Sequence, residues 1–418
     1  MMRSTDRVAR VIVALAIGLG PAACSVAPSR SPVSSPAATR LPSPASPGSV
    51  ASPSVPPPTA RAGGLADWRR LPPQSGLNGA GLLSVVSDGA GFLAVGCLAD
   101  PEGCMQPAIW ESDDGLAWRT AGPVFLPPDA TSGLVATAVT SRIGTIAAGR
   151  VGHEGRFQAS IWLRDVNGWV QITPQSATDA TVSSLLATDG RVLAVGSGAF
   201  TELAGFEAWW SADGTTWEAA PPLLGTDGYP VALLPLESSV LAWGPSCGVC
   251  VATTAWWVTG DGTAWQRVDP PPGLEGVYVS AIGNTQGGFE AFGTLGGGDL
   301  PVRPAAWAAD ETAAAWRPVE PPPQPEAASV NHMIPIGHGS VAAGDGPPGP
   351  GREQRTGLIW LRGPGETKWR EPTIVPDFEV LALVQHPDQL NRVIVIGRTY
   401  VGLQESAVIW TGLVDWAP

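Results

Sequence analysis

A segment with two Trp residues recurs along this chain at intervals of about 50 residues. In its clearest copy, AIWESDDGLAW at 108–118, an apolar run ends on Trp110, a turn follows, and Trp118 closes the segment. The other copies are SIWLRDVNGW (160–169), AWWSADGTTW (208–217), AWWVTGDGTAW (255–265), AAWAADETAAAW (305–316), LIWLRGPGETKW (358–369) and VIWTGLVDW (408–416). Seven copies of one pattern indicate a repeat architecture and override the two or three domains that length alone would suggest.

Each repeat contains four short segments that are typical of β-strands. The first is apolar and often β-branched, as in LLSVV (82–86) and VYVSAI (277–282), and the third and fourth each carry one Trp of the pair. The second ends on a Gly in all seven copies: Gly96, Gly149, Gly196, Gly244, Gly293, Gly344 and Gly397. Such a Gly indicates either crowded backbones or a positive φ angle. Four short strands joined by turns predict one antiparallel sheet per repeat.

Stacking of these sheets predicts the fold, because one small sheet is only marginally stable alone. Radial stacking about a central channel gives an all-β, seven-bladed β-propeller of four-stranded antiparallel blades over residues 63–418. The Trp rings would fill the wedges between sheets, each burying on the order of 200 Å². The chain ends two residues after Trp416, so the seventh repeat lacks its fourth strand. The segment LADWRRLP at 65–72 resembles such a strand. We therefore expect residues 66–71 to pair near 407–411 and to close the ring.

The first 62 residues have a different composition. Arg3, Arg7 and Arg10 precede an apolar run at 11–20 that is too short to span a membrane, so residues 1–23 are predicted to be an export signal. Pro21-Ala-Ala-Cys24 resembles a bacterial lipobox, which implies a lipid anchor on Cys24 and an extracytoplasmic location. The alternative is an ordinary secretory signal with a spare Cys. Residues 24–62 are rich in Pro, Ser and Ala and are predicted to be a disordered tether.

Net charge restricts the partners. Residues 1–60 carry +4, which leaves −17 for the rest of a chain whose total is −13. An acidic body repels phosphate backbones, so nucleic acid is not an expected partner. We expect a monomer that binds a protein or a glycan at the cell surface and that touches the membrane only through its lipid anchor.

The turn between the paired Trp residues carries a second motif. It is S-x-D-G-x-x-W at 112–118 and 211–217, with the related T-G-D-G at 259–262. This motif resembles the Asp-box (BNR) turn of sialidase-like and related propellers. The carboxylate suits such a turn because it accepts backbone N–H bonds, and Gly adopts positive φ. In that family the box is structural and lies opposite the ligand face, which implies a structural role for Asp114, Asp213 and Asp261.

The same resemblance makes a sialidase-type glycoside hydrolase the alternative function. Sialidases use an Arg cluster, a Tyr-Glu nucleophile pair and an Asp acid, and they usually have six blades. This chain has three Tyr, of which Tyr278 lies close to Glu275, and no Arg-Ile-Pro segment in its first repeat. We therefore expect a non-catalytic binding or scaffolding protein. A hydrolase would need two carboxylates roughly 5–9 Å apart near the channel.

The remaining Cys and His residues favour structural roles. Cys97 and Cys104 flank one loop between second and third strands, and Cys247 and Cys250 lie in the corresponding loop of the fourth repeat. In an exported protein we expect two local disulfides, with a shared zinc site as the alternative. The four His, at 153, 332, 338 and 386, are scattered and are expected to be surface or core residues.

Acidic residues recur at one register of the repeat. They lie ten residues after the second Trp, at Asp179, Asp227, Glu275, Glu326 and Glu379, and the first repeat has Asp129 at eleven. Equal register predicts one rim around the channel mouth, on the face away from the Asp turns. Such a rim could bind Ca²⁺ or a basic partner, and no other cofactor is expected. The alternative is that these acids are solvated turn residues.

Overall fold

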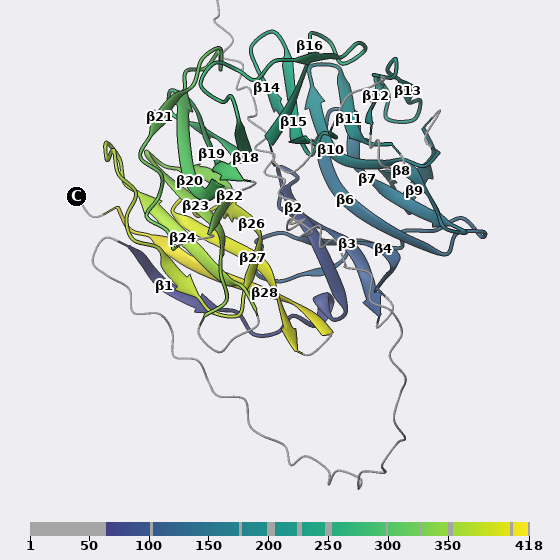
Figure 1. Ribbon diagram of the computed structural model, residues 1–418. Helices are drawn as coiled ribbons and strands as arrows, with labels where there is room; N and C mark the ends of the chain where they lie inside the picture. The colour runs from purple at the N-terminus through teal and green to yellow at the C-terminus, as the bar shows by residue number, and fades with distance from the viewer. Residues whose placement is uncertain are drawn as a thin grey trace, which may run out of the picture. The chain divides into compact units, whose positions relative to one another are not determined.

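The computed structural model describes residues 64–416, except for 101–102, 175–177, 199–204, 224–227, 247–252, 298–299, 326–327, 350–353 and 402–403. The described residues form 28 strands and one 3₁₀ turn, η1 (Ser75–Leu77). The strands make seven four-stranded antiparallel sheets, which confirms the predicted all-β, seven-bladed propeller (Figure 1). No helix in this part of the chain has the length and apolarity needed to cross a membrane. The predicted signal at 1–23, Cys24 and most of the predicted tether lie outside the described residues.

Six blades are built from consecutive strands, and each sheet keeps the sequence order. Blade 1 has β2 (Ala80–Ser87), β3 (Phe92–Asp100), β4 (Gly103–Ser112) and β5 (Arg119–Thr120), and blade 2 has β6 (Ser132–Ser141), β7 (Gly144–His153), β8 (Arg156–Asp165) and β9 (Gly168–Ile172). Blade 3 has β10 (Thr181–Thr188), β11 (Arg191–Ser197), β12 (Phe206–Ser211) and β13 (Glu218–Ala219), and blade 4 has β14 (Ala232–Pro235), β15 (Val240–Ser246), β16 (Thr253–Thr259) and β17 (Gln266–Val268). Blade 5 has β18 (Val277–Thr285), β19 (Gly288–Gly297), β20 (Leu300–Ala309) and β21 (Arg317–Val319), and blade 6 has β22 (Ser329–Ile336), β23 (Gly339–Gly346), β24 (Thr356–Arg362) and β25 (Thr373–Val375).

Blade 7 combines the two ends of the propeller. Its strands are β26 (Glu379–Gln385), β27 (Arg392–Val401), β28 (Gln404–Val414) and β1 (Leu65–Arg70), in that order across the sheet. Leu65 pairs with Val414 and Arg70 pairs with Trp410, so β1 is the fourth strand. Trp68 stacks on Trp410 with ring centroids 5.5 Å apart. The predicted closure of the ring by the N-terminal strand is confirmed.

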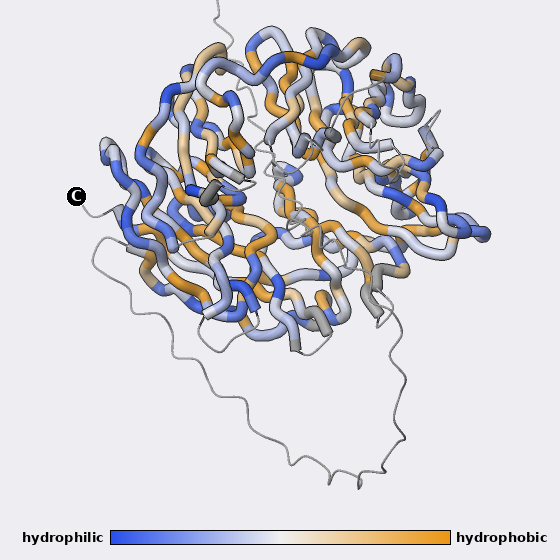
Figure 2. The backbone as a smooth tube through the Cα atoms, viewed as in Figure 1, coloured by the Kyte–Doolittle hydropathy of each residue, from blue (hydrophilic) through white to orange (hydrophobic). Residues whose placement is uncertain are grey.

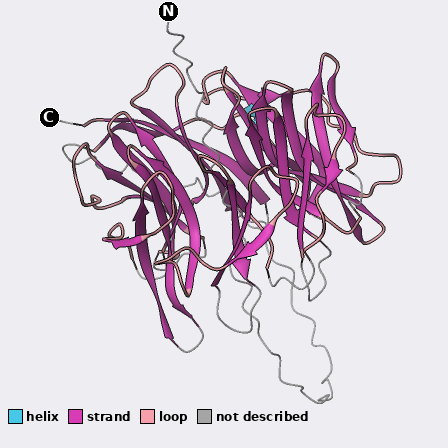
Figure 3. Ribbon diagram, turned by 90° about the horizontal axis from the view of Figure 1, so that it is seen from above, coloured by secondary structure: helices cyan, strands magenta, loops and turns pink. Residues whose placement is uncertain are grey.

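The antiparallel order separates the connections into two faces (Figure 3). The turns from first to second and from third to fourth strands lie at one end of the blades, which we call the turn face. The loops from second to third strands, and from each fourth strand to the next blade, lie at the other end, which we call the loop face. The Asp motifs are therefore on the turn face, opposite the predicted acidic rim.

Hydrophobic residues are frequent along the strands (Figure 2), and their side chains form clusters between adjacent blades. One cluster joins Val86 and Leu93 of blade 1 to Val135 and Ala147 of blade 2. Trp169 belongs to the same cluster, and its Nε1 donates to the carbonyl of Ala121 in blade 1 at 3.2 Å. The Trp rings thus pack between blades as predicted, which couples each sheet to its neighbour.

The recurring Gly is required by backbone crowding. A Cβ on Gly196 would lie 1.7 Å from the carbonyl oxygen of Thr181 on the first strand, and the corresponding distances in the other six blades are 1.9–2.2 Å. None of the seven has a positive φ. In six blades the first strand has a β-bulge at this level, as between Val182 and Ser184. Crowding at the bulge, rather than backbone conformation, is the reason for Gly.

Candidate functional site

The Asp turns on the turn face are closed structural units. In blade 1, Asp114 Oδ1 accepts N–H bonds from Leu116 at 2.8 Å and Ala117 at 3.0 Å, and Ser112 Oγ accepts one from Gly115 at 2.8 Å. Gly115 has a φ of 73°, which favours Gly. Trp118 Nε1 donates to the Gly115 carbonyl at 3.1 Å, which ties the turn to the second Trp of the pair.

The Asp213 turn has the same bonds, and the Asp261 turn shares those from Gly262 to Thr259 Oγ1 and from Thr263 to Asp261 Oδ1 but not the bond from the second Trp. Backbone N–H donors at Thr216 and Thr215 lower the pKa of Asp213 well below its usual range. The N–H and hydroxyl of Thr263 lower the pKa of Asp261. These carboxylates stabilise their own turns through backbone N–H bonds to Oδ1, which is the structural role that the sequence predicts for them.

The loop face begins with a polar layer. We define the mouth layer as residues on the first three strands of each blade. They lie level with the recurring Gly or one position nearer the loop face. It contains Arg150 after Gly149, Glu207 opposite Gly196, Tyr278 opposite Thr294, Asp345 after Gly344, and the cross-strand pair Glu379 and Arg398. Below this layer the same strands carry mainly Val, Leu, Ile and Ala.

Burial perturbs the ionisable groups of the mouth layer. Loss of solvent lowers the pKa of Arg150 and raises the pKa values of Glu207 and Tyr278. Burial also raises the pKa of Asp345 to about 7. Groups whose charged forms are disfavoured by burial, gathered at one end of a fold, are typical of functional sites.

Charged residues concentrate at the junction of blades 6 and 7. Asp345 Oδ1 accepts the N–H of Val380 in the next blade at 2.8 Å, and its Oδ2 accepts from Asn331 Nδ2 at 2.8 Å. Glu379 and Arg398 form two bonds, at 2.8 and 2.9 Å, and their side chains are only 16% and 17% exposed. The charge of Glu379 adds to the effect of burial on the pKa of Asp345, while Arg398 opposes it.

The predicted rim acids have separate partners. Asp179 lies 3.9 Å from Arg156, Glu275 Oε2 accepts the N–H of Gly273 at 2.9 Å, and Glu379 pairs with Arg398. Asp227 and Glu326 lie outside the described residues. Within the described ranges, no three His, Cys, Asp or Glu side chains are grouped so that they could hold a metal ion. Binding of Ca²⁺ or a basic partner at this rim stays a prediction.

The His and Cys residues are distributed as follows. His332 is buried between blades 6 and 7, and burial lowers its pKa to about 4, whereas His338 hydrogen-bonds Gln286. Cys97 follows Gly96 and is disulfide-bonded, while Cys247, Cys250 and the side chain of Cys104 lie outside the described residues. The two disulfide pairings therefore stay predictions.

Sequence reasoning missed most of the mouth layer. Glu379 was among the predicted site residues, but Asp345, Arg398, Arg150 and Glu207 were not. A usable signal was present, because Arg150, Asp345 and Arg398 each directly follow a recurring Gly. The sequence does not show that this position is half-buried in Arg150 and Arg398 and almost fully buried in Asp345.

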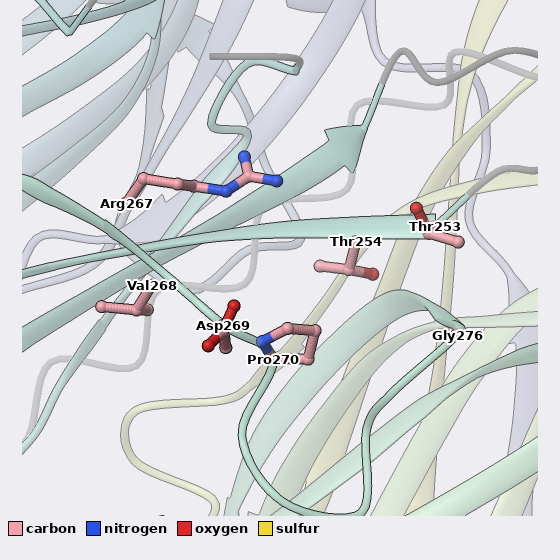
Figure 4. Close-up of a pocket in the computed structure, with 7 residues that line it drawn as sticks. All are labelled: Thr253, Thr254, Arg267, Val268, Asp269, Pro270 and Gly276. Carbon is pink, nitrogen blue, oxygen red and sulfur yellow. The ribbon is translucent and has the colours of Figure 1, made fainter.

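A cavity of about 630 Å³ opens on the loop face between blades 4 and 5. Its lining is Thr253, Thr254, Arg267, Val268, Asp269, Pro270 and Gly276 (Figure 4). Arg267 lies over the ring of Trp257 at 5.0 Å, and Thr254 Oγ1 accepts the N–H of Val279 in blade 5 at 2.7 Å. The cavity thus has a polar lining that includes one residue of each charge.

Comparison with known proteins agrees with this fold. No protein-family model and no curated protein matches the chain. Among solved structures, "YCF48 bound to D1 peptide" is 13% identical with a TM-score of 0.52, over 86% of this chain and 99% of that one. A Bombyx mori GH32 β-fructofuranosidase has 9% identity and a TM-score of 0.35, over 84% of this chain and 92% of its own. A Bacteroides ovatus glycosyl hydrolase has 12% identity and a TM-score of 0.35, over 57% and 86%. At 13% identity, the likeness to the first of these structures is one of fold alone.

Proposed function

We propose that this protein is a binding propeller of the bacterial cell surface whose loop face holds a polypeptide segment of a partner protein. The observation that carries the proposal is the mouth layer, where half-buried groups of both signs gather at one end of the blades. Charged and polar side chains of both signs at one surface can complement the peptide groups and charged side chains of a polypeptide.

The solved structures support a polypeptide as the ligand class. The protein in the similar propeller described above is bound to a peptide, and that likeness covers 86% of the present chain. An exported chain anchored through Cys24 would present its propeller at the membrane surface. Replacement of Cys24 by Ala is expected to abolish lipidation, which metabolic labelling with a fatty-acid analogue measures. Undiminished labelling of the variant would contradict the anchor.

Binding of peptides to variants of the two faces tests the proposal. The probe is an array of overlapping peptides from exported bacterial proteins, and the affinity of each retained peptide is measured by fluorescence anisotropy. The test variant combines Glu207→Gln with Glu379→Gln and Arg398→Met, which removes mouth-layer charges without leaving Arg398 unpaired. We expect at least about tenfold weaker binding, since charged groups dominate such contacts.

The matched control is Asp310→Asn on the turn face, where Asp310 Oδ1 accepts the N–H of Thr312 at 3.0 Å. This variant is expected to bind peptides as the wild type does. Equal loss of binding in both variants, or no retained peptide at all, would refute the proposed function.

A glycoside hydrolase remains the second candidate because of Asp345 and Glu379. Asp345 is a carboxylic acid with a pKa of about 7, and Glu379 is close enough to raise that pKa further. A neutral acid beside a carboxylate is the combination that glycosidases use. Release of a fluorophore from synthetic sialosides and other glycosides would support this function if Asp345→Asn abolished it. The hydrolase function falls if the wild type releases none.

A further inference from the structure

Strand β16 extends further toward the loop face than the fourth strand beside it. On its inner side, Thr253, Thr254 and Ala255 pair with Ser246, Pro245 and Gly244. On its outer side, pairing with β17 stops at Trp256 and Val268. Among the described residues, no strand residue lies opposite Thr254 on that outer side. The space beyond the end of β17 is the cavity between blades 4 and 5.

The backbone of Thr254 faces this space. In blade 1 the carbonyl of Ile109, one residue before Trp110, accepts the N–H of Ala121 on the fourth-strand side. In blade 3, Ala208 has the same place and accepts from Ala220. Trp256 is their counterpart in blade 4, and alternate residues of an antiparallel strand direct both backbone groups to the same side. The N–H and C=O of Thr254, two residues earlier, therefore point into the cavity.

In most other blades, the outer edge of the third strand at the level of Thr254 either lacks a backbone donor or is already paired. The counterpart of Thr254 on the third strand is Pro107 in blade 1 and Pro304 in blade 5. Pro has no N–H to donate. In blades 3 and 6 the chain itself pairs there, through Phe206 with Leu223 and Gly357 with Val375.

The two remaining blades also differ from blade 4. In blade 2 an isolated bridge joins Gln158 and Thr178 beside this position. In blade 7, Ala407 packs against the apolar cluster that contains Leu71 and Leu77. Of the edges that the described residues form, the one at Thr254 therefore combines an available N–H with an open cavity.

The chain after β17 is held away from this edge. Val268 is followed by Asp269 and three Pro residues, which cannot continue a strand ladder. The carbonyl of Pro272 accepts the N–H of Trp316 in blade 5 at 2.8 Å, and the carbonyl of Pro271 accepts the N–H of Leu274. These bonds direct the loop to the next blade and leave the outer side of Thr254 open.

We propose that the cavity between blades 4 and 5 binds an extended peptide segment that pairs with the backbone of Thr254 and continues the line of β17. This deepens the proposed function by naming a peptide subsite on the loop face. A strand added to a free sheet edge gains its main-chain hydrogen bonds from that edge, and flanking side chains select its sequence. Figure 4 places Arg267 and Asp269 on one side of Thr253 and Thr254. The subsite therefore fits a segment with polar or charged side chains.

The variant Thr254→Pro removes the N–H that the peptide would use. Pro is compatible with this position because Pro107 and Pro304 occupy it in blades 1 and 5. The matched control is Thr254→Val, which also loses the hydroxyl bonded to Val279 but keeps the backbone N–H. With a peptide retained from the array as the probe, we expect about tenfold or greater loss of affinity in Thr254→Pro and little change in Thr254→Val.

A second measurement uses the unaltered protein and therefore does not depend on folding of a variant. Each peptide amide is N-methylated in turn, which removes one backbone donor at a time. Methylation of the amide that donates to the Thr254 carbonyl should weaken binding to the wild type about tenfold, whereas methylation of the amides that point away from this edge should change little. If peptides bind but neither change weakens them, the subsite is wrong and the proposed function stands. If no peptide binds the wild type, both are refuted.

Discussion

Asp345 lies in an environment unlike that of an ordinary, solvated carboxylate. It is 4% exposed, and its two oxygens accept bonds from Val380 of blade 7 and Asn331 of its own blade. Glu379, Arg355 and Arg398 are the charged groups around it. Two hydrogen bonds do not offset the loss of water around a full charge, so the protonated acid is favoured.

Replacement of Asp345 by Asn is expected to stabilise the protein in alkaline solution. The folded-state pKa of about 7 exceeds the ordinary value of 3.8, so this group's stabilisation is complete below pH 3.8 and is lost as pH rises through 7. Asn imitates the protonated acid, because its Oδ1 accepts the Val380 N–H and its Nδ2 donates to Asn331 Oδ1 once the Asn331 amide is flipped. We expect a gain of about 1–3 kcal/mol in the free energy of unfolding at pH 8.5, and a smaller one at pH 5.

Urea denaturation at the two pH values measures this difference. Asp310→Asn is the control, because Asp310 is an exposed turn residue whose pKa is lowered by the Thr312 hydroxyl and N–H. It should show no alkaline gain. A change in stability of Asp345→Asn that is the same at both pH values would contradict the assignment.

Glu290 and Arg362 form a buried ion pair between blades 5 and 6. Glu290 is 2% exposed, its Oε1 accepts from Arg362 Nη1 at 3.0 Å, and the guanidinium lies 4.5 Å from the ring centre of Trp369. Loss of one partner would leave the other charge buried without compensation. Such losses are much larger than those at exposed pairs.

We expect Glu290→Gln to lower the free energy of unfolding by about 3 kcal/mol, and addition of Arg362→Met to restore most of it. Urea denaturation of the two single variants and the double variant gives the coupling between these residues. The exposed pair of Lys368 and Glu320, 3.0 Å apart, is the control, and Lys368→Met should change little. Additive effects of Glu290→Gln and Arg362→Met would contradict the coupling.

At the scale of the strand, the bulge and the recurring Gly lie at the same level of the sheet in six blades. At the level of the bulge, a first-strand carbonyl lies so close to the second strand that only a residue without Cβ fits beside it. The polar residues of the mouth layer begin at this level. The bulge therefore marks where core packing ends and the candidate site begins.

Comparison of Gly293→Ala with Gly287→Ala tests, within blade 5, whether backbone crowding requires Gly at this level. A Cβ on Gly293 would lie 2.0 Å from the carbonyl of Tyr278, whereas one on Gly287 would meet no atom within 4 Å. We expect Gly293→Ala to lower the free energy of unfolding by about 1–3 kcal/mol or to prevent folding. Gly287→Ala should leave it nearly unchanged. Thermal melts of both variants decide, and equal stability of the two would exclude crowding as the reason for Gly.

The elements were largely predictable from sequence, and the candidate site was not. Trp pairs and Asp turns repeat, so the strand order, the two faces and the orphan strand around Trp68 follow from counting. The charged mouth layer does not repeat, since Arg150, Glu207 and Asp345 differ in type from blade to blade. Their burial depends on neighbouring blades, as the bond from Val380 of blade 7 to Asp345 of blade 6 shows. Such a contact cannot be predicted from the sequence of one repeat.

At the scale of the whole molecule, β1 is the element that makes the ring continuous. Leu65 and Trp68 are 3% and 6% exposed and belong to the core between blades 6 and 7. Without β1, blade 7 would present the open edge of β28, and its apolar side would be uncovered. Closure therefore stabilises every blade through its neighbours.

A chain that begins at Leu71 should lose this closure, while one that begins at Gly64 should keep it. We expect the shorter chain to melt on the order of 10 °C lower, with a broader transition, because a strand with a buried Trp is missing. A synthetic peptide of residues 63–71 should restore the melting temperature. Circular dichroism measures both, and identical melts of the two chains would contradict a closing role for β1.

The closing strand also determines the face of the propeller at which the preceding chain joins it. β1 starts beside Val414, at the end of blade 7 that belongs to the turn face, and the N–H of Asp415 bonds the carbonyl of Gly64 there. Whatever precedes Gly64 in the polypeptide joins the propeller on that side. The attachment point of the preceding chain therefore lies at the opposite end of the blades from Arg150, Thr254 and Asp345, and that chain does not enter the ring beside the candidate site.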